Sequence, residues 1–140
     1  MIRKITNQAL PYAWGSRTLF SDYLAIEATG GPMAEIWFGT HPGSLARDFE
    51  TPATTLLDLR ADRPLSFLLK ILAADSPLSI QAHPNKAQAA EGFERENLAG
   101  ISLSAAHRNY RDAGHKPEMI VALSEFEALC GFRSDPRQSD

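Results

Sequence analysis

Glycine and proline punctuate the first third of this chain so closely that long helices are disfavoured there. Short segments at residues 11–16 and 24–28 are followed by a turn-forming run at 30–32, and such spacing favours strands and turns. Apolar and β-branched residues predict later strands at 34–40, 67–72, 79–83, 116–123 and 126–132. The sequence therefore predicts a mainly β fold.

Two helices are expected between these strands. Asn85 and Gln88 form a capping-box pattern, and strong helix formers follow them, which predicts a helical segment at about 85–99. Gly92 weakens that helix. A short helix is expected at 54–60, and residues 101–114 are expected to form an exposed connection.

Size and charge narrow the class of protein. A chain of 140 residues is the size of one domain, and a net charge of -3 with scattered lysines and arginines gives no basic patch for nucleic acid. No stretch approaches the about 18 apolar residues that span a bilayer, and no leader is evident. We therefore expect a cytoplasmic protein with neither nucleic acid nor membrane as a partner. The single cysteine, Cys130, fits a reducing compartment and is expected to be a small buried hydrophobe rather than a nucleophile.

Polar side chains alternate along residues 79–83. In an extended strand Ser79, Gln81 and His83 project from one face, although an ordinary half-solvated strand has the same pattern. Glu118, on a later predicted strand, would add a carboxylate to the amide oxygen and the imidazole. Catalytic zinc sites commonly take three such ligands, and imidazole favours zinc over hard ions. By spacing alone Glu118 is equally well a surface carboxylate, so both interpretations stay open.

Two lysines lie close to these residues in the predicted strands. Lys70 is inside the apolar run at 67–72, where its ammonium must either extend to solvent or meet an anion. Lys116 is two residues from Glu118, so the two side chains would share one face of a strand.

The stretch around Glu118 resembles a known signature. Residues 110–118 read Tyr-Arg-Asp-Ala-Gly-His-Lys-Pro-Glu, which is similar to the pattern Tyr, any, Asp, any, Asn, His, Lys, Pro, Glu of the type I mannose-6-phosphate isomerases (phosphomannose isomerases). The one departure is Gly114, where the family has Asn; it concerns the geometry of a turn more than the chemistry. Further similar blocks occur in the same order at 12–16, 34–42, 67–70, 78–84 and 126–133.

This resemblance implies a cupin-type β-jelly roll that holds one zinc ion per chain. Gln81, His83 and Glu118 match three ligand positions of the family. The family's fourth ligand is a histidine far downstream, so residues 1–140 are expected to be the N-terminal portion of the zinc-binding catalytic domain, with an incomplete jelly roll and without the downstream helical and C-terminal cupin parts. His41 is expected to be structural and His107 solvated.

The implied reaction is the aldose-ketose isomerisation of mannose 6-phosphate and fructose 6-phosphate through a cis-enediol. Lys116, beside Glu118, is expected to act on a substrate oxygen or as an acid or base, with an ion pair to a nearby carboxylate as the alternative interpretation. The resemblance also places four residues at the sugar-phosphate pocket: Trp14, Glu35, Lys70 and Ser79. Trp14 and Glu35 are equally interpreted as a core aromatic and a buried hydrogen-bonding group.

Two other hypotheses accompany the enzyme. A partial cupin with three ligands would hold metal or sugar phosphate without turnover, and would lose its metal in a His83→Ala variant. A purely structural remnant would have open strand edges and a tendency to associate.

Overall fold

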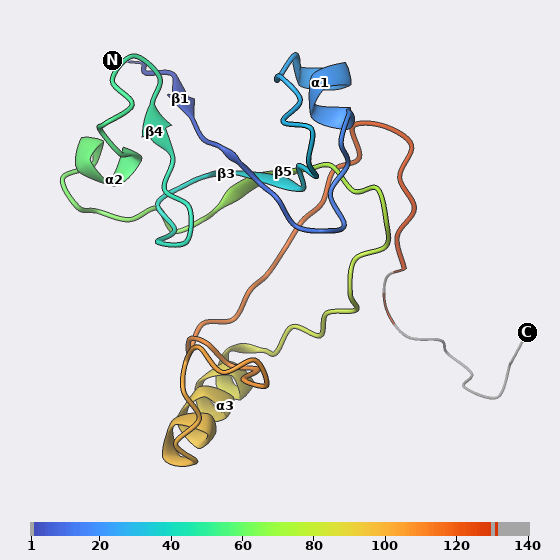
Figure 1. Ribbon diagram of the computed structural model, residues 1–140. Coiled ribbons are helices and arrows are strands. Elements are labelled where there is room, and N and C mark those ends of the chain that lie inside the picture. Colours follow the sequence, from blue (N-terminus) through green and yellow to red (C-terminus); the bar gives the residue numbers. More distant parts are fainter. Residues whose placement is uncertain (1, 130, 132–140) are drawn as a thin grey trace, which may run out of the picture. The chain divides into compact units, whose positions relative to one another are not determined.

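The computed structural model describes residues 2–129 and 131. These residues divide into two compact units, one that ends at Ile80 and one that begins at Gln81 (Figure 1). The first unit contains two small antiparallel sheets and two short helices; the second contains one helix and irregular segments. The bounds of the helices and strands, in chain order, are β1 Ile5–Thr6, β2 Ala9–Leu10, α1 Leu19–Leu24, β3 Glu35–Phe38, β4 Arg47–Asp48, α2 Leu56–Leu59, β5 Leu69–Leu72 and α3 Lys86–Leu98.

The larger sheet runs in the order β2-β3-β5, and β1 pairs separately with β4. Strand β3 lies in the middle, with Ile36 opposite Ile71 and Trp37 opposite Lys70. Because side chains alternate along a strand, Ile36 faces the core while Trp37 faces the other side of the sheet. The core on the Ile36 side consists of Phe20, Met33, Ile36 and Ala73.

Gly15 is required where the chain passes close to β3. It forms a bridge to Ala74, and a Cβ on Gly15 would lie 2.6 Å from the Cα of Ala34. No side chain fits at that distance, so the glycine allows the two backbones to approach each other.

Both predicted helices are present and start with capping boxes. In α2, the Asp58 N–H donates to Thr55 Oγ1 at 3.1 Å and Thr55 N–H donates to Asp58 Oδ2 at 2.8 Å, and the Thr55 hydroxyl holds the pKa of Asp58 below its usual value. In α3, Asn85 and Gln88 exchange the same pair of bonds at 3.0 Å each. These bonds satisfy backbone N–H groups that have no partner within the helix.

The predicted class, mainly β with a helical segment and an incomplete jelly roll, is confirmed: the sheets of residues 2–129 do not close into a barrel. The strands at 34–40 and 67–72 are present as β3 and β5. No strand forms at 79–83, at 116–123 or at the described residues of 126–132, which are 126–129 and 131, so these three predictions were wrong there. Each segment has a suitable composition, but a strand also requires a partner to pair with, and none of the described strands pairs with them. Cys130 lies outside the described residues.

Among the described residues, no helix combines the length and the apolar character that crossing a membrane requires.

Candidate functional site

His83 and Glu118 lie close together although 35 positions separate them in the sequence. The His83 Nε2 atom is 3.8 Å from Glu118 Oε2, with the two side chains 34% and 60% exposed. Both belong to the unit that begins at Gln81, and His83 lies just before the Asn85 cap of α3. The chain thus brings an imidazole and a carboxylate to one solvent-accessible place.

This pair fits two positions of a zinc site. Two ligand atoms that are each about 2 Å from a tetrahedral zinc ion lie about 3.3 Å apart, close to the 3.8 Å observed. Their exposure leaves room for further ligands or water. No group of three or more His, Cys, Asp or Glu side chains forms among the described residues, so a third ligand from this part of the chain would be of another type.

Gln81 supplies such a type, two residues before His83. Its side chain is exposed and forms no hydrogen bond within the described part of the chain. The structure therefore brings together two of the three predicted ligands, and the assignment of Gln81, His83 and Glu118 to one metal stays a prediction.

Lys116 forms an ion pair with Asp112, with Nζ 3.2 Å from Asp112 Oδ2 and both side chains more than half exposed. This is the arrangement of the alternative interpretation, and a catalytic role for Lys116 stays a prediction. Asp112 Oδ1 also accepts a hydrogen bond from Gly114 N–H at 2.8 Å. A Cβ on Gly114 would lie 3.0 Å from this oxygen, so an asparagine there would require only a small shift of the Asp112 side chain.

A shallow hollow opens beside His83. Its volume is about 380 Å³, and it is lined by Ala82, His83, Pro84, Gln88, Glu91, Arg95 and Tyr110. Arg95 and Glu91 contribute opposite charges, and the Arg95 guanidinium lies 5.7 Å from the centroid of the Tyr110 ring. The hollow is polar and contains one of the predicted metal ligands.

A polar cluster lies on one face of β3 and β5, in the unit that ends at Ile80. It consists of Glu35, Trp37 and Lys70. Lys70 Nζ lies 3.4 Å from Glu35 Oε2 and 4.4 Å from the centroid of the Trp37 ring, and the Trp37 Nε1–H donates to Glu35 Oε2. Glu35 is 7% exposed. Lys70 thus meets an anion and an aromatic face, and only about a third of its side chain remains exposed.

The other two residues predicted at the pocket are Trp14 and Ser79, which form fewer contacts. Trp14 stacks on Tyr12 with centroids 5.9 Å apart, and its carbonyl accepts a hydrogen bond from Asp75 N–H at 2.9 Å. Ser79 is exposed and makes no hydrogen bond among the described residues. Their roles in binding stay predictions.

His41 and His107 differ in their surroundings. The His41 ring lies edge-on to Trp37 with centroids 5.0 Å apart, and its Nδ1 accepts a hydrogen bond from Gly43 N–H at 3.0 Å. His107 is exposed.

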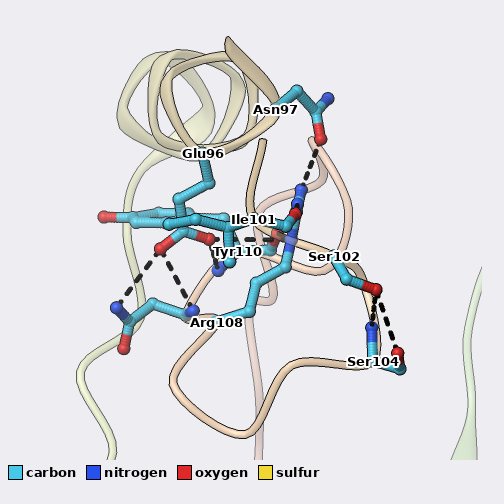
Figure 2. A network of polar contacts seen from close by, with 8 residues as sticks. Glu96, Asn97, Ile101, Ser102, Ser104, Arg108 and Tyr110 are labelled. Atoms are coloured by element: carbon cyan, nitrogen blue, oxygen red, sulfur yellow. Dashed lines mark hydrogen bonds and ion pairs between the residues drawn. The ribbon is translucent and has the colours of Figure 1, made fainter. Parts of the chain in front are cut away.

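Sequence reasoning missed the most buried polar residues of the second unit. Residues 101–114 are not the uniformly exposed connection that was predicted, because Arg108 is 5% exposed and Tyr110 is partly buried. Both contact Glu96 of α3, and the backbone N–H of Tyr110 is the main cause of a lowered pKa at Glu96. Figure 2 shows this network. Gly92 gave a signal that could have revealed it, since a glycine within a helix often marks close packing.

Comparisons with known proteins place these features in a family. Residues 2–135 match the family Phosphomannose isomerase type I, catalytic domain. The chain is 42% identical to mannose-6-phosphate isomerase of Escherichia coli (strain K12) over 94% of its own length and 38% of that protein. It is 40% identical to mannose-6-phosphate isomerase of Homo sapiens over 87% of its length and 32% of that protein.

A solved structure is similar as well. Mannose 6-phosphate isomerase bound with zinc and yttrium matches with a TM-score of 0.68 and 41% identity, over 81% of this chain and 33% of that chain. The likeness confirms the cupin-type class predicted from the sequence. The chain thus spans about a third of the length of the curated relatives that it matches.

Proposed function

Because this chain belongs to the type I phosphomannose isomerase family, we propose that it serves the zinc-dependent interconversion of mannose 6-phosphate and fructose 6-phosphate. The observation that carries the proposal is the approach of His83 to Glu118 at 3.8 Å. Glu118 ends the family signature and His83 lies in a separate matching block, so two distant motifs meet at one place. The partner is a small sugar phosphate, and residues 1–140 correspond to the N-terminal portion of the zinc-binding cupin catalytic domain.

We assign Gln81, His83 and Glu118 as the ligands of one zinc ion per chain. Support comes from the zinc-bound relative and from the 3.8 Å separation of two of the side chains. Bound zinc would supply positive charge to stabilise the negative charge that develops on the sugar oxygens of the enediol.

Protein side chains would bind the sugar and transfer its protons. Lys116, two residues from Glu118, donates a hydrogen bond from its ammonium to a sugar oxygen, or, as the neutral amine, takes the proton from one reacting carbon and returns it to the other. To do so it must leave Asp112, and their exposed ion pair opposes this only weakly because such pairs contribute about 0–1 kcal/mol.

Lys70 and Ser79 bind the phosphate or the sugar hydroxyls. Lys70 already faces a carboxylate and an indole ring, and a phosphate dianion would compete with Glu35 for its ammonium. Glu35 and Trp14 line the same pocket. When Lys70 turns to the phosphate, Glu35 keeps the hydrogen bond from Trp37, so the carboxylate does not lose all its partners.

The solvent exposure of the His83–Glu118 pair favours a second candidate function. The two side chains are 34% and 60% exposed. In this alternative, the cupin fragment binds metal or sugar phosphate without turnover. For either function we propose a cytoplasmic location, consistent with a single cysteine in 140 residues.

One experiment separates the two functions. Purified 140-residue chain with added zinc is assayed for conversion of mannose 6-phosphate to fructose 6-phosphate, alongside Glu118→Ala and the exposed control Glu94→Ala. Turnover that is lost only in Glu118→Ala supports the enzyme. A folded chain that binds zinc or mannose 6-phosphate without turnover supports the non-catalytic fragment, and a folded chain that binds neither and shows no turnover contradicts both.

A further inference from the structure

Helix α3 holds the beginning of the family signature through two buried charges. Glu96 and Arg108 are 7% and 5% exposed, and Arg108 Nε lies 3.6 Å from Glu96 Oε2. Charges buried to this degree require partners for their remaining hydrogen-bonding positions. In this chain those partners are mostly backbone groups of residues 101–110.

Glu96 and Arg108 form hydrogen bonds with the two polar backbone groups of one residue, Tyr110. Glu96 Oε2 accepts a hydrogen bond from Tyr110 N–H at 2.8 Å, and Arg108 Nε donates to the Tyr110 carbonyl at 2.6 Å. Glu96 Oε1 also accepts from the backbone and side-chain nitrogens of Asn109, at 3.2 and 3.3 Å. Figure 2 shows both carboxylate oxygens directed at this backbone. Both polar groups of the Tyr110 backbone are therefore fixed.

Arg108 is itself held on three further sides. Its Nη2 donates to Asn97 Oδ1 at 2.7 Å, its Nη1 donates to the Ile101 carbonyl, and its guanidinium lies 5.2 Å from the centroid of the Phe93 ring. A planar guanidinium with this many acceptors cannot be replaced by a lysine without loss of bonds.

The Tyr110 side chain is fixed as well. Its ring lies so close to α3 that a Cβ on Gly92 would be 2.5 to 2.6 Å from three of its carbons. The same ring lines the hollow beside His83. Tyr110 is thus anchored through both its backbone and its ring to the helix whose N-cap follows His83.

We infer that Glu96 and Arg108 are positioning residues, which anchor Tyr110 on α3 so that the exposed segment 111–118 delivers Glu118 to His83. This inference rests on the proposed zinc site. Glu118 is 35 positions from His83 but only 8 from Tyr110, and residues 111–118 contain no helix or strand. The cost of closing a flexible loop rises with its length, so loss of the anchor should weaken joint zinc binding by about tenfold.

The test compares Glu96→Gln and Arg108→Lys with two matched controls on exposed neighbours, Glu94→Gln and Arg111→Lys. Glu96→Gln replaces an accepting oxygen with an NH₂ group. Arg108→Lys keeps the positive charge but loses the planar set of N–H donors of the guanidinium. Zinc affinity is measured in the full chain by competition with a chromophoric chelator. Two zinc-free readouts accompany it: nuclear Overhauser contacts between the His83 ring and the Glu118 side chain, and amide hydrogen exchange of α3.

Both positioning variants should bind zinc about tenfold more weakly and lose the His83–Glu118 contact, with α3 exchange unchanged, while both controls behave as the wild type. Retained affinity and contact in the positioning variants would overturn the inference. So would opening of α3 in both variants, because the two residues would then support the helix itself. If the wild type takes up no zinc, the proposed metal site fails, and the His83–Glu118 contact alone decides the positioning role.

Discussion

Trp37 and Lys70 face each other across β3 and β5, and the Lys70 ammonium lies 4.4 Å from the centre of the Trp37 ring. The same ammonium reaches Glu35 at 3.4 Å. A cation held by a ring and a carboxylate is already largely ordered. An anion that binds to it therefore loses less binding free energy to side-chain ordering than it would with a free lysine.

A Lys70→Met variant should therefore bind mannose 6-phosphate about 10- to 100-fold more weakly, because a hydrogen bond to a charged group contributes about 1.5–3 kcal/mol. Stability should fall as well, because the Glu35 carboxylate is buried and would keep only the bond from Trp37 among the described residues. Calorimetric titration measures the affinity and thermal unfolding the stability, with the exposed Lys86→Met as control. Unchanged affinity in Lys70→Met would remove Lys70 from the binding site.

A His83→Ala variant should bind zinc more than about 100-fold more weakly than the wild type. Mutation of a residue that only supports a metal ligand already costs up to about 100-fold in metal affinity, and a direct ligand should cost more. The imidazole would coordinate the metal directly, and the remaining amide and carboxylate ligands bind zinc poorly without it. Metal content after dialysis gives the result, and the exposed His107→Ala is the matched control. Equal zinc content in the two variants would show that the metal, if present, lies elsewhere.

Acid should weaken the first unit through Asp48. A hydrogen bond from Arg3, followed by the Thr51 backbone N–H, lowers the pKa of Asp48 from 3.8 to about 2. Because the folded pKa is below the unfolded one, Asp48 stabilises the fold above pH about 4, and this stabilisation is lost as the pH falls through about 2.

The melting temperature measured between pH about 5 and about 2 tests this. In Asp48→Asn, the amide oxygen can still accept the bonds from Glu50 and Thr51, but the side chain carries no negative charge. The variant should therefore be less stable than the wild type at pH about 5, and its stability should fall less on acidification. The exposed control Glu27→Gln should follow the wild-type curve. An Asp48→Asn curve parallel to the wild type over the whole range would contradict the assignment.

Gly92→Ala should destabilise the second unit despite the helix preference of alanine. The new Cβ would overlap the Tyr110 ring, at a cost of about 1–3 kcal/mol, whereas alanine improves helix stability by about 1 kcal/mol. Urea unfolding followed by the helix signal gives the net change. In a Tyr110→Ala background the sign should reverse, so that adding Gly92→Ala increases the stability; persistence of the loss there would mean that the ring is not its cause.

The elements that could be predicted from sequence are those with local signals. The capping residue Asn85 marks the start of α3, and the apolar runs around Ile36 and Ile71 mark β3 and β5. The segments at 79–83 and 116–123 have equally suitable residues, but a strand is completed by a neighbour that no local pattern supplies.

The candidate site divides in the same way. The meeting of His83 with Glu118 was predicted through matching motifs rather than through spacing. The pairing of Glu96 with Arg108 joins residues 12 positions apart, one on a helix and one in an irregular segment, and no helical or strand periodicity relates them. Only packing between the helix and the returning chain brings these charges together.

The cluster around Lys70 gives the chain its own optical reporter. The sequence has only two tryptophans; the Trp37 indole lies beneath an ammonium and donates to a carboxylate, whereas Trp14 stacks on Tyr12. A charge near an indole changes the energy of its excited state. An anion that draws Lys70 away from Trp37 would therefore change the intrinsic fluorescence, and a Trp14→Phe variant would assign that change to the cluster without any added label.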